Sequence, residues 1–451
     1  MSKQPQREPT AVPETAKRVG ETRWKWVERA VWSERMLRAL GNGVKGGKWY
    51  SLMDKVLAPK TLELAFRKVK ANRGSAGVDG ISIARFEKYL EKNLRKIHEE
   101  LRAGTFQPLP IKRTWIDKPG SKEKRPLGIP TVRDRVVQTA LKLVLEPIFE
   151  QEFIESSHGF RPNRGTKDAL RMTNRYLKGG NRWVVDADFS KFFDTIPKDR
   201  LMDRVTELIA DGKVLTLIRS YLDQRVMEEG RSWVPEAGTP QGAIISPMLA
   251  NLYLNPLDHQ MMEVDIACVR YADDLVILCK GPLEAQAALN ILRDWSEQQG
   301  LSLHPEKTRL VDMTQPMAGF DFLGYHFQVS KKGPEIINRW PSMKSKKRLR
   351  AKIRPYTKRA NGHSMEAIIG KINPILKGWF EHFKHSRRNE FPSIDGWIRM
   401  RLRSILRKRR KLRGKGRGSD HQRWPNAYFS ALGLFSTENA HRVALARSRS
   451  G

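Results

Sequence analysis

Two adjacent aspartates, Asp273 and Asp274, lie in the middle of an apolar stretch, and this pair constrains the fold more than any other feature of the chain. The residues before the pair read ACVRYA and the residues after it read LVILC, which predicts two buried strands joined by a tight turn. Aspartate suits a turn, so an ordinary hairpin is one interpretation. Two neighbouring carboxylates repel each other, however, and burial adds to the cost. A bound cation would offset both penalties.

A second acidic strand occurs upstream, in the stretch WVVDADFSKFFD. Asp186 and Asp188 are two residues apart and therefore point to the same side of a strand. Asp188 ends the apolar run and would join Asp273 and Asp274 in one cluster. Such hard oxygen ligands suit Mg²⁺. Two Mg²⁺ ions about 4 Å apart can activate a 3′-hydroxyl and stabilise a leaving pyrophosphate, which is polymerase chemistry.

The charge of the chain is extreme and unevenly distributed. Lys and Arg number 84 against 49 Asp and Glu, a net charge of +35. Residues 331–451 alone hold 32 basic and 7 acidic residues, a net charge of +25. This excess predicts a polyanionic partner, most simply nucleic acid, although a basic protein that merely stays soluble is the alternative.

Cysteine content and hydropathy indicate the cellular environment in which the protein works. Cys268 and Cys279 are the only cysteines and lack CxxC spacing, which argues against a disulfide scaffold or a cysteine zinc site and favours a reducing, intracellular setting. No apolar stretch approaches the ~20 residues of a membrane span, so no membrane partner is expected. Residues 1–23 are polar and predicted to be a disordered lead-in rather than a signal peptide.

Apolar periodicity and turn residues predict an α+β chain. Helices are expected over residues 24–40, 61–70, 86–101, 132–149, 198–226, 248–262 and 282–299, a hairpin over 111–130, and strands over 301–313 and 320–330. Basic helices follow from residue 341, one of them with Asn373 as its N-cap and Pro374 at its first position. The domains expected are a lead-in (1–23), a helical extension (24–60), a catalytic region (61–335), a helical region (336–412) and a basic C-terminal region (413–451).

Ten motifs in order resemble one known family. GSAGVDG, KRPLGIPTVRDRVVQTAL, SSHGFRPNRG, VVDADFSKFFD, GTPQGAIISPMLANLYL, VRYADDLVIL, LSLHPEKT and FLGYHF are similar to the successive polymerase blocks of bacterial group II intron reverse transcriptases, or maturases. INPILKGWFEHF and WPNAYFSALGLF are similar to the maturase region of that family. The resemblance covers nearly the whole chain from about Trp24.

The resemblance implies a right-hand polymerase fold, with fingers, an antiparallel palm sheet, a helical thumb and a small basic C-terminal domain. It implies that Asp188, Asp273 and Asp274 bind two Mg²⁺ ions and that Lys307 is a proton donor to pyrophosphate. The nucleotide-binding residues it implies are Lys118, Arg125, Phe193 and Gln241. The candidate nucleic-acid-binding residues are Arg161, Arg164, Lys346, Lys347, Arg401, Arg403, Arg407 and Arg410.

Several of these residues fit a second interpretation. Phe193 suits core packing as well as a gate against the ribose 2′-hydroxyl, and Lys307 suits a solvated charge as well as a proton donor. Asp186 and Asp194 are interpreted as structural, with Asp194 capping the helix after it. Trp379, Trp397 and Trp424 could stack on bases, although the first two fall on apolar helix faces, which favours core packing.

Two departures from the family pattern bear on function. The stretch QGAIISP has Ala243 where the family often has a second glycine, and no paired cysteines follow for an endonuclease domain. The resemblance then implies splicing assistance and retrohoming in the bacterial cytoplasm, near the nucleoid, with intron RNA, target DNA, a primer 3′ end and dNTPs as partners. A splicing cofactor without polymerase activity, or a domesticated enzyme of repair or defence, are the alternatives. The sequence leaves the oligomeric state open.

Overall fold

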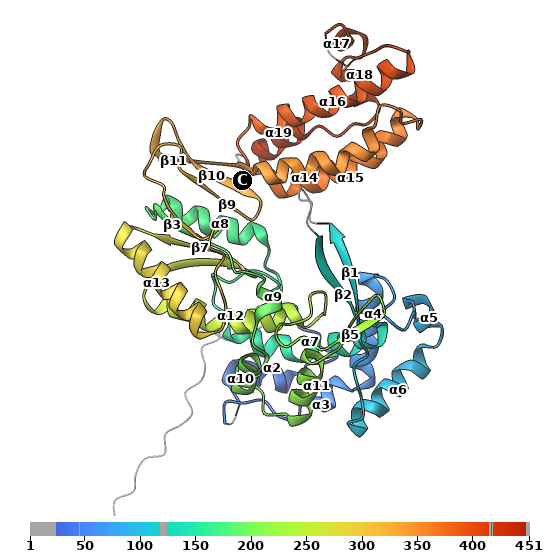
Figure 1. Cartoon of the computed structure of the whole chain (residues 1–451), viewed down its shortest axis with the longest axis vertical. Helices are drawn as coiled ribbons and strands as arrows, with labels where there is room; N and C mark the ends of the chain where they lie inside the picture. Colours follow the sequence, from blue (N-terminus) through green and yellow to red (C-terminus); the bar gives the residue numbers. More distant parts are fainter. Residues whose placement is uncertain (1–23, 45, 118–123, 415, 417, 448–451) are drawn as a thin grey trace, which may run out of the picture.

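The computed structural model describes residues 24–44, 46–117, 124–414, 416 and 418–447. These residues form a mixed α/β chain with three sheets (Figure 1). The N-terminal helices lie at one end, a β-hairpin and a four-stranded sheet lie at mid-height on opposite sides of the view, and the C-terminal helices lie at the other end. Within the described part of the chain, no helix is long and apolar enough to cross a bilayer.

The N-terminal body is largely helical. Its helices are α2 (Glu34–Asn42), α3 (Met53–Val56), α4 (Pro59–Asn72), α5 (Ile83–Lys88), α6 (Leu90–Ala103) and α7 (Val132–Glu152). Helix α7 is buried on most of its faces and packs against α4. Thr131 caps its N-terminus by accepting a hydrogen bond from the Asp134 amide.

A small sheet projects from this body. It has the order β2-β1-β4-β5, with β1 (Ile111–Asp117), β2 (Lys124–Ile129), β4 (Val226–Glu228) and β5 (Arg231–Trp233). The antiparallel pairing of β1 with β2 confirms the predicted hairpin. Lys118, between these strands, lies outside the described residues.

The central sheet has the order β6-β7-β3-β8, and all its pairs are antiparallel. Its strands are β3 (Trp183–Ala187), β6 (Ala267–Tyr271), β7 (Asp274–Cys279) and β8 (Arg309–Asp312). Helices α8 (Thr166–Lys178), α12 (Ser246–Glu263) and α13 (Pro282–Gln298) pack against this sheet. The chain between β3 and α12 also forms α9 (Phe192–Thr195), α10 (Lys198–Leu208) and α11 (Gly212–Leu222), and α10 packs against α12. Val185 and Ile277 pack in the large N-terminal core, whereas their neighbours Val184 and Val276 pack in a second core with α8. Apolar side chains therefore fix the sheet from both faces.

The C-terminal third continues into a hairpin sheet and a helical bundle. The strands are β9 (Gly319–Phe322), β10 (Tyr325–Ser330) and β11 (Gly333–Pro341). The helices are α14 (Met343–Ile353), the 3₁₀ helix η1 (Arg354–Thr357), α15 (Met365–Phe383), α16 (Glu390–Arg409), α17 (Asp420–Arg423), α18 (Asn426–Ala431) and α19 (Thr437–Arg447). Trp424 and Phe429 share one core with Ile372 and Leu402, so packing continues across residue 413.

Four of the predicted helices and two of the predicted strands differ from the structure. Residues 86–101 are divided at Tyr89 between α5 and α6. Of residues 301–313 only Arg309–Asp312 form a strand, and residues 320–330 divide into β9 and β10. Residues 24–32 form turns, and α2 begins only after Ser33, whose side chain caps it. The segment 198–226 is divided by Asp211, which caps α11 and also accepts hydrogen bonds from the amides of Leu52 and Met53. Helix α15 begins at Met365 with Ser364 as its N-cap and runs through Pro374.

Asn373 has a different role from the predicted cap. Its amide donates a hydrogen bond to the Gly433 carbonyl at 2.8 Å and accepts one from the Phe435 amide at 2.9 Å. The side chain therefore fastens the segment after α18 to the middle of α15. The predicted N-cap is therefore wrong, and the partner of Asn373 lies 60 residues away instead of in the next helical turn.

Candidate active site

The central sheet brings the ends of two acidic strands together. Strand β3 pairs with β7 through Ala187 opposite Leu275, and Asp188 and Asp274 are the next residue on each strand. Asp274 also pairs with Tyr271 across the β6–β7 turn, which leaves Ala272 and Asp273 as the two turn residues. The predicted hairpin is confirmed, and the same end of the sheet carries Asp188, Asp273 and Asp274.

The three carboxylates influence one another. Burial, then repulsion from Asp273 and Asp188, raises the pKa of Asp274 to about 6. Burial, together with the charge of Asp188, also raises the pKa of Asp273. Asp274 lies at the exposed first position of β7, next to strand residues that are buried. Like charges at the mouth of a sheet favour a cation there.

Two basic side chains already approach this end of the sheet. Lys307 Nζ lies 2.5 Å from Asp188 Oδ2, and Arg309 donates two hydrogen bonds of 3.2 Å to Asp186 Oδ2. Asp186 is therefore an ion-pair partner, as its structural interpretation predicts. Among the described residues, no three His, Cys, Asp or Glu side chains already form a metal-binding group. Lys307 supplies one positive charge to the cluster in this arrangement.

The β1–β2 hairpin is fixed to the loop that carries Gln241. The Gly128 amide donates to the Gln241 carbonyl at 2.7 Å. Gly242 has φ +103°, and a Cβ at that position would lie 2.2 Å from the Gly128 carbonyl oxygen. Only a glycine allows this approach. Arg125 is exposed on the same strand, β2. Because the Gly128–Gln241 contact holds β2 against the loop, it also sets the position of Arg125 relative to Gln241.

Phe193 and its neighbour Asp194 contact the loop that carries Gln241. The Phe193 carbonyl accepts from the Thr239 amide at 2.7 Å, and its ring is half-buried against Phe192. Gln241 Nε2 donates to Asp194 Oδ2 at 3.0 Å. Asp194 is therefore not a helix cap as predicted; Pro197 occupies the N-cap position of α10.

Comparisons with known proteins agree with this geometry. Residues 116–327 match the family described as "Reverse transcriptase (RNA-dependent DNA polymerase)", and residues 346–424 match "Group II intron, maturase-specific domain". Protein YkfC of Escherichia coli (strain K12) is 31% identical over 320 residues, which cover 61% of this chain and 82% of YkfC. The chain belongs to the group II intron reverse transcriptase and maturase family.

Two further likenesses cover a smaller share of this chain and of the matched protein. The group II intron-encoded protein LtrA of Lactococcus lactis subsp. cremoris is 37% identical over 209 residues, which cover 46% of this chain and only 35% of LtrA. A solved structure titled "Partial Cas6-RT-Cas1--Cas2 complex" covers 55% of this chain and 41% of its own at 24% identity and a TM-score of 0.36. An overlap as weak as the second carries no argument about fold or function.

The predicted nucleic-acid-binding residue Arg161 is buried in this maturase-family protein. Its guanidinium bonds Glu150 Oε1 at 2.7 Å and the Ser157 carbonyl at 2.6 Å, and its side chain is only 2% exposed. Direct contact with a template is therefore ruled out in this conformation, and Arg161 instead holds the loop after α7. Arg164 is less buried and pairs with Glu155 at 2.9 Å.

The basic residues of the C-terminal helices divide into two groups. Arg403 is buried and donates to the Trp424 carbonyl and to Asn426 Oδ1, each at 2.9 Å, so its predicted contact with nucleic acid is wrong. Lys346, Arg401 and Arg407 also have protein partners, namely Glu390, Thr357 and Asp420. Lys347 and Arg410 are exposed. Trp424 is buried as well, which removes it as a base-stacking platform.

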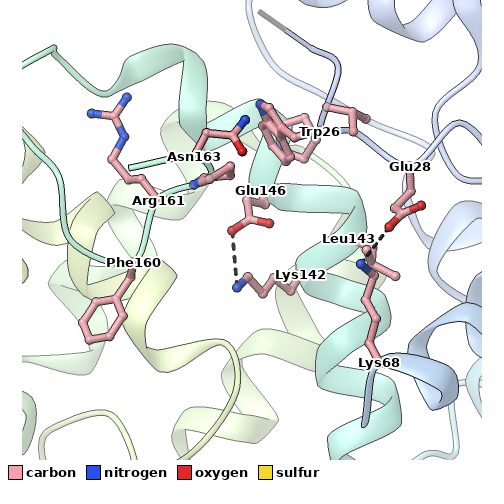
Figure 2. Close-up of a pocket in the computed structure, with 12 residues that line it drawn as sticks. Trp26, Glu28, Lys68, Lys142, Leu143, Glu146, Phe160, Arg161 and Asn163 are labelled. Atoms are coloured by element: carbon pink, nitrogen blue, oxygen red, sulfur yellow. Dashed lines mark ion pairs between the residues drawn. The ribbon is translucent and has the colours of Figure 1, made fainter. Parts of the chain in front are cut away.

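A pocket of about 280 Å³ lies between the N-terminal segment, α4, α7 and the loop after α7 (Figure 2). Four of its charged side chains form two ion pairs, Lys142 with Glu146 at 3.3 Å and Lys68 with Glu28 at 2.7 Å. None of the three clustered aspartates lines it. This pocket is therefore separate from the candidate active site.

Arg270, Asp258 and Asn251 form a buried cluster that contacts the acidic turn, and the sequence did not predict it. Arg270 donates to both of the other side chains, and all three are buried. A signal was present, because an arginine inside the apolar run ACVRY must find a partner when it is buried. The position of that partner could not be read from the sequence.

Proposed function

We propose that this protein is an RNA-directed DNA polymerase of a group II intron, which binds its intron RNA, assists splicing and copies the RNA into DNA during retrohoming. The observation that carries the proposal is the convergence of Asp188, Asp273 and Asp274 at one end of the β6-β7-β3-β8 sheet. The reverse-transcriptase and maturase-specific matches support the two halves of the proposal. In this interpretation the central sheet is the palm, β1–β2 belongs to the fingers and α14–α16 belong to the thumb.

The three aspartates would hold Mg²⁺, because their oxygens are hard ligands and their mutual repulsion raises the pKa of Asp274. When bound, two Mg²⁺ ions would activate the primer 3′-hydroxyl and neutralise charge on the leaving pyrophosphate. Lys307 would release Asp188 and donate a proton to that pyrophosphate. Its exposed side chain and its ion pair with Asp188 suit such a movement.

The incoming dNTP would lie between the β1–β2 hairpin and the loop of residues 240–242, which we call the PQG loop. Arg125, together with Lys118, would bind the triphosphate, because an arginine fork matches phosphate oxygens. Gln241 would line the nucleotide pocket. Phe193 would crowd a ribose 2′-hydroxyl, since its half-buried ring adjoins the same loop.

The Phe193 gate predicts a specific change in selectivity. A Phe193→Val variant should incorporate rNTPs at least about 10-fold better relative to dNTPs, because a smaller side chain admits the 2′-hydroxyl. The ratio of kcat/KM for GTP and dGTP measures this effect. A Phe192→Leu variant, which alters the adjacent core ring, is the control. An unchanged ratio in Phe193→Val would assign Phe193 to packing alone.

The C-terminal helices and the exposed residues Lys347 and Arg410 would bind intron RNA and the template–primer duplex through phosphates. The net charge of +25 over residues 331–451 supports this assignment. The partners proposed are intron RNA, target DNA with its primer 3′ end, and dNTPs. The proposed location is the bacterial cytoplasm, in association with the nucleoid.

Primer extension tests the polymerase half of the proposal. The wild-type protein should extend a DNA primer on an RNA template with dNTPs and Mg²⁺, and an Asp273→Ala, Asp274→Ala double variant should lose this activity. Normal extension by the double variant would overturn the proposed site.

Splicing of the intron at physiological Mg²⁺, with and without protein, tests the maturase half. The expected result is faster splicing with the protein, including the double variant, because RNA binding does not use the aspartates. Equal splicing without protein, together with normal primer extension, would instead favour a reverse transcriptase of repair or defence. Splicing assistance without primer extension would leave a splicing cofactor only.

A further inference from the structure

Arg270 is a fully buried cation next to the acidic turn. It lies in β6, three residues before Asp273, and its exposed fraction is 0%. A buried charge persists only with a partner. Asp258 of α12 is that partner: Arg270 Nε lies 2.8 Å from Asp258 Oδ1, and Nη2 bonds the other carboxylate oxygen. The guanidinium is therefore fixed to α12 on one side.

The other side of the same guanidinium reaches the turn itself. Arg270 Nη1 donates to the Ala272 carbonyl at 3.0 Å and to Asn251 Oδ1 at 2.9 Å. Ala272 has φ +60°, which is a conformation that a residue with a β carbon rarely adopts. The hydrogen bond to its carbonyl therefore stabilises an unfavourable peptide immediately before Asp273.

The loop after α7 contacts both the Arg270 network and the turn. Asn251 Nδ2 donates to the Gly159 carbonyl at 2.6 Å, and the His158 amide donates to the Arg270 carbonyl at 2.9 Å. A Cβ on Gly159 would lie 2.2 Å from the Ala272 amide nitrogen, so the loop backbone is in direct contact with the turn. The turn is thus held between a buried side-chain network and a close backbone contact.

We propose that Arg270 is a positioning residue, which with Asp258 and Asn251 holds the Ala272 peptide in its left-handed conformation and so aims Asp273 at the bound metal. This inference rests on the proposed polymerase function. Arg270 would act through the turn backbone and would not touch substrate. Lysine cannot replace it, because one ammonium group cannot serve Asp258, Asn251 and the Ala272 carbonyl in a fixed plane.

Hydrogen exchange in the metal-free protein tests the inference without catalysis. In Arg270→Lys, the amides of residues 271–275 should exchange about 10-fold faster than in the wild type, while the β3 amides keep their protection. Asp258→Asn should have the same effect. If Arg270→Lys fails to fold, Asn251→Ser provides the milder test, because it removes one link and leaves the ion pair. Unchanged exchange of the turn in a folded variant would overturn the proposal.

Single-nucleotide addition gives the second measurement. The Mg²⁺ concentration for half-maximal rate should rise about 10–100-fold in Arg270→Lys, with KM for dNTP changed by less than about 3-fold, as expected when the support of a metal ligand is removed. The matched control is Asp395→Asn, which changes a buried carboxylate of α16 that bonds Ser436 and Thr437. This control should lower stability and leave the Mg²⁺ requirement unchanged.

The two measurements separate this inference from the proposed function. An active wild type whose Arg270→Lys variant keeps the wild-type Mg²⁺ requirement contradicts the positioning role alone. An inactive wild type contradicts the polymerase proposal, and the exchange measurement still decides whether Arg270 holds the turn. An equal rise in Mg²⁺ requirement in Asp395→Asn would show a general loss of stability and would also overturn the role of Arg270.

Discussion

At the scale of single residues, the acidic cluster destabilises the metal-free folded protein, while the same carboxylates are the proposed metal ligands. The folded protein raises the pKa of Asp274 from a usual value of 3.8 to about 6 through burial and the charges of Asp273 and Asp188. The folded state therefore binds this proton more tightly than the unfolded state between about pH 4 and pH 6. Stability falls as pH rises through that window, and the ionised carboxylate remains unfavourable above it.

Replacing Asp274 should therefore stabilise the metal-free protein. We predict that Asp274→Asn raises the melting temperature at pH 7.5 in EDTA by roughly 1–3 °C, while it abolishes polymerisation. At pH 4 the difference should shrink, because the wild-type carboxyl is then protonated in the folded state. Differential scanning calorimetry at both pH values measures this. A lower melting temperature for the variant at pH 7.5 would contradict the repulsion described here.

The sequence predicted which aspartates come together better than it predicted which arginines are exposed. Asp188, Asp273 and Asp274 could be grouped because apolar runs located the strand ends next to them. Arg161 was assigned to the template path from the family resemblance, and Arg403 was assigned to nucleic acid because it belongs to a basic helix. Both are buried, and they bond Glu150 and the Trp424 carbonyl respectively. Tertiary partners decide whether an arginine is buried, and its own sequence neighbourhood does not reveal them.

At the scale of elements, the contact between β2 and the PQG loop determines where the hairpin lies. Gly242 has φ +103° and approaches the Gly128 carbonyl so closely that no side chain fits. We predict that Gly242→Ala displaces the hairpin and raises KM for dNTP about 10-fold, because Arg125 then moves relative to Gln241. Steady-state primer extension measures KM.

Gly180→Ala is the matched control for this change. Gly180 also has a positive φ, +96°, but a Cβ there meets no atom within 4 Å. It therefore carries the same kind of backbone strain without the collision, and KM for dNTP should stay within about 2-fold of the wild type. A similar rise in both variants would assign the effect to backbone strain instead of hairpin displacement.

Two hairpins were predicted correctly, whereas several helix boundaries and the strands over residues 301–313 and 320–330 were not. The alternation and apolar runs of residues 111–130 and 267–279 specify hairpins through local contacts, and both were confirmed. Helix α15 was misplaced because Asn373-Pro374 is a strong local start signal. The structure overrides it, since Asn373 bonds Gly433 and Phe435 from the middle of a helix. A long-range contact also accompanies the break in residues 198–226, since Asp211 accepts hydrogen bonds from the amides of Leu52 and Met53.

At the scale of the whole molecule, the basic residues are concentrated away from the acidic cluster. The acidic cluster lies on the central sheet, and the basic excess lies in the C-terminal helices at the far end of the chain (Figure 1). Phosphate binding by exposed Lys and Arg releases counterions. We predict that RNA affinity falls at least about 100-fold between 50 and 200 mM salt.

Two exposed residues should account for part of this salt dependence. A Lys347→Gln, Arg410→Gln double variant should reduce the slope of log affinity against log salt by about 1–2. Lys92→Gln, an exposed change on α6, should leave the slope unchanged. Filter binding over a salt series measures both. Equal slopes for the wild type and the double variant would exclude Lys347 and Arg410 from the RNA-binding surface.

The central claim is that Asp188 belongs to a metal-dependent polymerase centre, while its neighbour Asp186 only pairs with Arg309. Both aspartates lie at the end of β3, so Asp188→Asn and Asp186→Asn are matched changes. RNA-templated extension of a DNA primer over a Mg²⁺ series tests the claim directly. We predict that Asp188→Asn lowers the rate at least about 1,000-fold at every Mg²⁺ concentration, while Asp186→Asn stays within about 10-fold of the wild type. Comparable activity of the two variants would contradict the account.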